Sequence, residues 1–155
     1  MKWITSRDSW AFILTAYLPR LALCSLTWEI LQLPLYTLWA EPHWQAMLFP
    51  ILHCTAGDII IGGLSLLIAL TLNQAGKRNN WSTLRICAWT IALAVSYTVF
   101  SERNNLTLGN WAYSAAMPIV PWIEVGIAPI AQWIIVPLLS WRWAQKSAGH
   151  SQSDL

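Results

Sequence analysis

The sequence predicts an all-α integral membrane protein built as a four-helix bundle. Of its 155 residues, 56% are hydrophobic and only 10% are charged, whereas about a quarter of the residues in soluble domains are charged. The apolar residues form long runs separated by short polar segments, as expected of membrane-spanning helices. Twelve tryptophans add a second signal, because tryptophan is enriched where a membrane meets water. We expect six of them to be such anchors: Trp3, Trp39, Trp44, Trp81, Trp141 and Trp143. One membrane domain accounts for residues 1–155.

The first apolar run is too long for one upright span. Residues 9–39 would make a helix of about 46 Å, against a hydrocarbon core of about 30 Å. We therefore expect a break at Pro19-Arg20 and a first span over residues 20–39. Residues 9–18 then form an N-terminal interfacial helical segment or begin a strongly tilted helix. In that span Glu29 lies on a stripe of small and polar residues, which membrane helices turn toward their neighbours.

The second predicted span, residues 46–72, carries His53 and Asp58. Ionisable side chains inside a membrane are costly and usually functional. Gly62 follows on the same face as Asp58, and a small residue there permits close approach of another helix. Because His53 lies about 140° around the helix from Asp58, we expect it to be a hydrogen-bonded core histidine rather than a ligand.

The remaining two predicted spans cover residues 82–102 and 120–141. Residues 106–118 between them are rich in turn formers, and we expect them to fold over the mouth of the bundle. Prolines in the last span predict a kinked helix, and we expect Glu124 to be its solvated start. Residues 143–155 form a tail.

The basic residues predict the orientation. Eight of the nine Lys and Arg side chains fall on one side of these spans: Lys2, Arg7, Arg20, Lys77, Arg78, Arg85, Arg142 and Lys146. The positive-inside rule then places both termini in the cytoplasm. The expected location is the bacterial inner membrane, crossed several times, with membrane lipid as a partner.

Charge and cysteine content exclude other classes. The formal charge is only +2 and the basic residues are scattered, so no nucleic-acid role is expected. The three cysteines fall one to each of three apolar runs without a CxxC pair, so we interpret them as small buried side chains rather than disulfides. No cofactor is favoured by any motif.

The unusual polar residues gather at similar depth in the outer half of the predicted bundle. Glu29 and Asp58 are the expected acid and base, His53 orients or relays, and Glu102 with Asn105 guards the entrance. The predicted catalytic residues are Glu29, Asp58, His53 and Glu102. The predicted substrate-binding residues are Gln32, Tyr36, Tyr97, Asn105, Trp111 and Gln132.

Buried carboxyl groups of this kind favour acid–base chemistry on a lipid or isoprenoid, as in an isomerase or cyclase. One carboxyl group that holds its proton and one that has lost it can move a proton on and off a double bond. Tryptophan faces stabilise a developing carbocation, and the candidates are Trp28, Trp89, Trp111 and Trp133.

Three alternatives remain open at this point. The polar groups also suit a structural or accessory subunit of a membrane complex or homo-oligomer, in which they bond helix to helix. They suit a small proton, ion or solute transport protein. Finally, iron, manganese or zinc could bind to a set made of His53, Asp58, Glu29 and Glu102.

Four short motifs resemble the pattern of a family of small four-span bacterial membrane proteins. They are Trp28-Glu29-x-x-Gln32-x-Pro34-x-Tyr36, His53-Cys54-Thr55-Ala56-Gly57-Asp58, Ser101-Glu102 with Asn105, and Gly109-x-Trp111-Ala112-Tyr113-Ser114 with Met117-Pro118. The resemblance covers most of residues 25–140 and implies no catalytic residues. Integral-membrane terpene cyclases and four-helix lipid isomerases are similar only in architecture, since they also place acidic residues inside a bundle.

Overall fold

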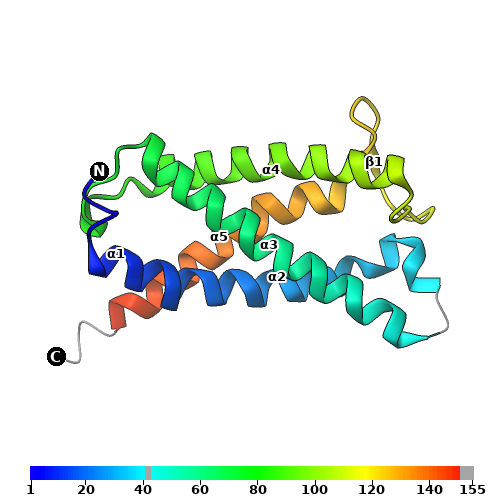
Figure 1. The fold of residues 1–155 in the computed structure, drawn as a ribbon, viewed down its shortest axis with the longest axis horizontal. Helices are drawn as coiled ribbons and strands as arrows, with labels where there is room; N and C mark the ends of the chain where they lie inside the picture. Colours follow the sequence, from blue (N-terminus) through cyan, green and yellow to red (C-terminus); the bar gives the residue numbers. More distant parts are fainter. Residues whose placement is uncertain (41–42, 151–155) are drawn as a thin grey trace.

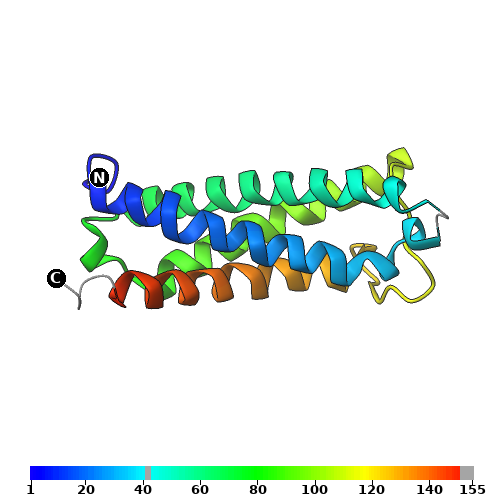
Figure 2. The ribbon, with the colours of Figure 1, turned by 90° about the horizontal axis from the view of Figure 1, so that it is seen from below.

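The computed structural model describes residues 1–40 and 43–150, which form a bundle of four long helical rods lying side by side (Figures 1 and 2). The long helices are α2 (Leu18–Gln32), α3 (Trp44–Leu72), α4 (Thr83–Leu108) and α5 (Ile127–His150). The shorter helical elements are α1 (Arg7–Ala11), η1 (Phe12–Tyr17), η2 (Leu33–Leu35), η3 (Thr37–Ala40) and η4 (Arg78–Asn80). The predicted four-helix architecture is confirmed.

A small hairpin departs from the all-helical prediction. Strands β1 (Ile119–Val120) and β2 (Val125–Gly126) pair antiparallel just before α5. The last helix therefore begins at Ile127 rather than at residue 120. Glu124 lies in the hairpin turn with a φ of 53°, so its predicted role as a helix start is wrong.

The N-terminal rod is continuous where a break was expected. Between α1 and α2, the segment η1 is a π-helix, and the N–H of Leu18 bonds to the carbonyl of Ile13, five residues earlier. Proline normally disrupts a helix by clashing with the carbonyl four residues before it. The wider π turn loosens this region just ahead of Pro19, which lies in the first turn of α2. The predicted break at Pro19-Arg20 is therefore wrong, and the continuous rod agrees with the other expectation, that residues 9–18 begin the same helix as the first span.

Three helical stretches are long and apolar enough to cross a membrane: Arg7–Leu35, Met47–Leu72 and Thr83–Leu108. Helix α5 has 24 residues and lies alongside them (Figure 2), but it is not among these three. Pro42, in the predicted loop after the first span, and residues 151–155 of the predicted tail lie outside the described residues. Helix α5 itself runs to His150, well into that predicted tail.

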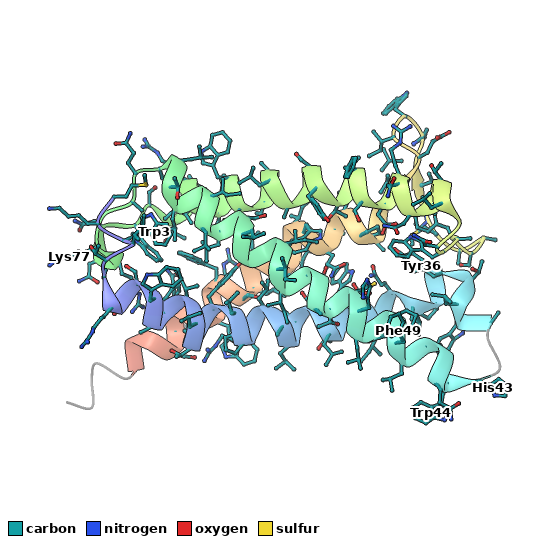
Figure 3. The ribbon with its side chains drawn as sticks, viewed as in Figure 1. Trp3, Tyr36, His43, Trp44, Phe49 and Lys77 are labelled. Carbon is teal, nitrogen blue, oxygen red and sulfur yellow. The ribbon has the colours of Figure 1, made fainter. Side chains whose placement is uncertain are left out.

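The N-terminus and the end of α5 lie at one end of the bundle (Figure 1), and buried aromatic side chains pack together there. Phe12 packs edge-on against Trp81 and Trp141, with ring centroids 5.9 and 5.4 Å apart. Trp3 is also buried and points inward near Lys77, whereas Trp44 projects from the opposite end (Figure 3). Trp3 and Trp141 are therefore core residues, and their predicted role as interface anchors is wrong.

Side chains of α2 and α5 pack tightly against α3 at Gly62. A Cβ atom there would lie 2.5 Å from Leu21 Cδ2 and 3.2 Å from the ring of Trp133. Leu21 and Trp133 are themselves buried and cannot move aside freely. The predicted close helix contact at Gly62 is confirmed.

Candidate functional site

A cavity of about 230 Å³ opens between the helices in the half of the bundle away from the chain termini. All ten residues that the sequence singled out line it: Glu29, Gln32, Tyr36, His53, Asp58, Tyr97, Glu102, Asn105, Trp111 and Gln132. They come from α2 and the segment after it, from α3, α4 and α5, and from the loop after α4. The structure therefore brings the predicted residues together, while their chemical roles remain predictions.

Glu29 and Asp58 meet at the side chain of Gln132. The Gln132 amide nitrogen donates to Asp58 Oδ2 at 2.6 Å and to Glu29 Oε1 at 3.2 Å. The two carboxyl groups also lie within hydrogen-bonding reach of each other. Both side chains are buried, with exposed fractions of 9% for Glu29 and 7% for Asp58. Two buried carboxyl groups this close are most stable when they hold one proton between them.

A second amide extends this network along α2. Gln32 donates to Glu29 Oε1 at 2.9 Å and to Gln132 Oε1 at 3.5 Å. Its own oxygen accepts the indole N–H of Trp28 at 3.1 Å. Trp28 therefore contacts the network rather than the cavity, and its predicted role beside a carbocation is replaced by this hydrogen bond.

Glu102 forms a separate cluster at the mouth of the cavity. The phenols of Tyr36 and Tyr113 both donate to Glu102 Oε2, the first at 3.4 Å. Burial raises the pKa of both phenols, and the adjacent Glu102 raises it further. The phenols therefore stay protonated and available as donors well above neutral pH.

The loop after α4 folds over this mouth, as the sequence predicts. The backbone of Thr37 donates to the carbonyl of Ala112, and that of Ser114 donates to the carbonyl of Leu35, each at 2.9 Å. Tyr113 also accepts the backbone N–H of Gly126 at 3.0 Å. One residue thus connects the loop, the hairpin and Glu102.

His53 differs from its prediction. It is exposed and stacks on Phe49 with ring centroids 5.5 Å apart, so it is not a core histidine. It borders the cavity from outside the buried network. Among the described residues, no three His, Cys, Asp or Glu side chains converge on a possible metal position. The alternative set of His53, Asp58, Glu29 and Glu102 does not fit a metal.

Asn105 and three further tryptophans were also predicted to lie at the site. Asn105 bonds to Ser101 of its own helix and accepts from Asn110 at 2.7 Å, so it fixes the end of α4 at the cavity wall. Trp111 and Trp133 line the cavity. Trp89 is 48% exposed and is not among the lining residues, so its prediction as a cavity tryptophan is wrong.

Two residues of the site were missed as functional candidates. Tyr113 belongs to a motif that the sequence displays, but nothing in its spacing indicates a partner on α4. Gly57 lines the cavity, and a Cβ there would meet no heavy atom within 4 Å. The sequence feature that could have identified Gly57 as a site residue was its position one residue before Asp58.

No protein-family model matches this chain, and no curated protein or solved structure is significantly similar to it. The functional argument therefore depends on the cavity and its side chains.

Proposed function

We propose that this protein is an integral membrane enzyme that isomerises or cyclises a lipid or isoprenoid by proton transfer. The observation that carries the proposal is the pair of carboxyl groups, Glu29 and Asp58, held together by one amide on the wall of a buried cavity. Such a pair offers an acid and a base at one place, which is what double-bond migration requires.

The reaction balances without a further reactant. One carboxyl group gives its proton to an alkene carbon, and the π electron pair becomes the new C–H bond. The other carboxylate removes a proton from the carbon next to the resulting cation, and that C–H pair becomes the new double bond. The proton then returns between the carboxyl groups through their mutual contact. In a cyclase, a second double bond attacks the cation before the proton is removed.

The cavity lining suits a developing positive charge. It contains the carboxyl groups of Glu29, Asp58 and Glu102, and none of the described lining residues is Lys or Arg. Aromatic side chains complete the walls: Tyr36, Tyr97, Trp111 and Trp133. Negative charge and aromatic faces in a buried site both stabilise a cation more strongly than they do in water.

In this proposal the bundle spans the bacterial inner membrane with α5 as a fourth span and both termini in the cytoplasm. The basic residues gather toward the terminal end, consistent with the positive-inside rule. The cavity then lies in the outer half of the membrane. The aromatic cluster of Phe12, Tyr17, Trp81 and Trp141 fills the opposite half, which favours a closed reaction chamber over a path through the membrane.

Deuterium exchange tests the proposal on a panel of lipids, so that no single substrate has to be chosen. Purified protein is reconstituted in vesicles with polyprenyl and unsaturated acyl lipids in heavy water, and the lipids are analysed by mass spectrometry. The wild type should introduce deuterium at carbon beside a double bond, and Asp58→Asn should not.

The matched control is Asp8→Asn, which removes the same group from an exposed position paired with Arg78 at 3.6 Å. It should exchange as the wild type does. Exchange at the wild-type rate in Asp58→Asn, or no exchange with any lipid of the panel, would overturn the proposed function.

A further inference from the structure

The hydrogen bonds of the amide network at the cavity run in one donor-to-acceptor order, which begins at Trp28. An indole N–H can only donate a hydrogen bond. The Gln32 atom that faces Trp28 at 3.1 Å must therefore be the amide oxygen. This points the NH₂ group of Gln32 away from Trp28, toward Glu29.

The orientation of Gln32 in turn fixes the orientation of Gln132 on α5. The NH₂ group of Gln32 also faces Gln132 at 3.5 Å, so the atom it meets there is the Gln132 oxygen. The NH₂ group of Gln132 then points to the two carboxyl groups. Turning Gln132 over would set its oxygen against the carboxyl groups and its nitrogen against that of Gln32. Turning Gln32 over would set its oxygen against the oxygens of Glu29 and Gln132, and its nitrogen against the indole N–H of Trp28.

With the amides oriented in this way, the two carboxyl groups accept different numbers of amide hydrogen bonds. Glu29 Oε1 accepts two amide N–H groups, one from Gln32 at 2.9 Å and one from Gln132 at 3.2 Å. Asp58 accepts only one, from Gln132 at 2.6 Å. Amide donors stabilise a carboxylate more than they stabilise the neutral acid, so the negative charge belongs where more of them converge.

We infer that Asp58 carries the proton and Glu29 the charge in the resting protein, and that Trp28, Gln32 and Gln132 are positioning residues that set this order. The free oxygen of Asp58 donates its proton toward Glu29, with which it is in hydrogen-bonding contact. Asp58 is then the acid that protonates a substrate, and Glu29 is the base.

The surrounding groups leave this asymmetry intact. The other ionisable groups near the pair are Glu102 on α4, Cys54 on α3 and Tyr36 after α2. Glu102 is itself bonded to Tyr36 and Tyr113. Ser25 of α2 is buried, with its hydroxyl within hydrogen-bonding reach of Asp58. Because a hydroxyl can donate to a carboxylate or accept from a carboxylic acid, it fits either protonation state of Asp58.

Infrared spectroscopy of the full chain in lipid nanodiscs tests this order directly. A protonated carboxylic acid gives a carbonyl stretching band that a carboxylate lacks. Protein labelled with ¹³C-aspartate should show a shift of that band, and Asp58→Asn should lose it. The other described aspartate, Asp8, is exposed and ion-paired with Arg78, so it adds no such band. A band that shifts only with ¹³C-glutamate and disappears in Glu29→Gln would overturn the inference.

A second variant tests the positioning residues. Gln32→Met removes one of the two donors to Glu29, so the aspartate band should lose intensity and a glutamate band should gain it. Trp28→Phe, which frees the orientation of Gln32, should act in the same direction. The control is Thr27→Val, since Thr27 is exposed and bonds only within its helix, to Leu23 at 2.8 Å. Unchanged bands in Gln32→Met would overturn the role of the amides.

The inference concerns the site of the proposed function, but its test needs no substrate. A protein that shows the aspartate band and no deuterium exchange would refute the proposed function alone. A protein that exchanges deuterium and shows only the glutamate band would refute the inference alone.

Discussion

Gly57 determines how much of the cavity stays open. It lies one residue before Asp58 on α3 and lines the cavity, and an added Cβ would point into open space. A larger side chain there would occupy the volume that a substrate needs while leaving the carboxyl groups and amides in place.

We expect Gly57→Leu to abolish deuterium exchange into lipid because the new side chain fills a cavity of only about 230 Å³. Gly57→Ala should retain most of the exchange, and Ala56→Leu, on the exposed side of the same turn, should retain all of it. Thermal unfolding in detergent should show all three variants folded. Full exchange in a folded Gly57→Leu protein would show that the reaction occurs elsewhere.

Gly62 and the next residue, Gly63, make a matched pair for testing helix packing. We expect Gly62→Ala to lower the free energy of unfolding by about 1–3 kcal/mol, as overpacking of a core does, because the new methyl group would meet Leu21 and Trp133. Gly63→Ala meets only Leu18, at 3.4 Å, so alanine's higher helix propensity should leave the protein as stable or more stable. Denaturant titration in detergent measures both, and equal stability of the two variants would contradict this packing.

The sequence indicates which residues gather at the cavity, but it does not indicate which hydrogen bonds they form there. A carboxyl group or amide in an apolar helix is recognisable in the sequence alone because burying it is costly. Which atom donates to which depends on side-chain positions from separate helices. Gln132 could therefore be predicted as a site residue, but its bonds to both Glu29 and Asp58 could not.

Among the elements, helix α3 was the easiest to predict and the N-terminal rod the hardest. An uninterrupted apolar run predicted residues 46–72, and the helix covers Trp44–Leu72. Pro19 suggested a break because most prolines cause one, but the π turn before it is a local adjustment with no sequence signature. The hairpin before α5 was missed because strands of two residues are too short to show alternation.

The loop after α4 is the element whose stability should depend on pH. Burial and Glu102 raise the pKa of Tyr113 and Tyr36 above their ordinary value. A raised phenol pKa means that the folded protein holds these protons more tightly than the unfolded chain. The stabilisation is therefore complete below the unfolded-state pKa of about 10 and is lost as the pH rises above it.

We accordingly expect the unfolding temperature to show no phenol-dependent change up to about pH 10 and to fall above it. The fall should be smaller in Tyr113→Phe, which lacks the Tyr113 contribution. At neutral pH this variant should also be less stable by about 1–3 kcal/mol, since Glu102 and the Gly126 N–H both lose a hydrogen-bond partner. Differential scanning fluorimetry across the pH range measures this, and identical alkaline slopes in the two proteins would contradict it.

The whole molecule is asymmetric along its length. Its terminal end is filled by aromatic side chains and surrounded by basic residues, while the opposite half encloses carboxyl groups. The sequence predicted this arrangement because an even number of antiparallel helices returns both termini to one end. Hydropathy alone does not identify α5 as a possible membrane span. This helix carries the charged residues Arg142 and Lys146 near the terminal end of the bundle.

Orientation in the membrane is the property on which access to the cavity depends, and single cysteines can measure it. In a protein with Cys24, Cys54 and Cys87 replaced by alanine, Trp122→Cys places a thiol on the hairpin, where Trp122 is 90% exposed. Asn79→Cys places one at the terminal end without changing the charge. The positive-inside rule predicts that a membrane-impermeant maleimide labels only Trp122→Cys in intact bacterial cells.

Inverted membrane vesicles should give the opposite result, with Asn79→Cys labelled and Trp122→Cys protected, and the cysteine-free protein provides the background. The reverse labelling pattern would mean that the bundle has the opposite orientation in the membrane, with its cavity open toward the cytoplasmic leaflet. Labelling of both positions from one side would mean that α4, which separates them in the chain, does not cross the membrane. Because Glu102, on α4, lines the same cavity as Glu29 and Asp58, that outcome would place the carboxyl pair outside the membrane and contradict chemistry on a lipid tail.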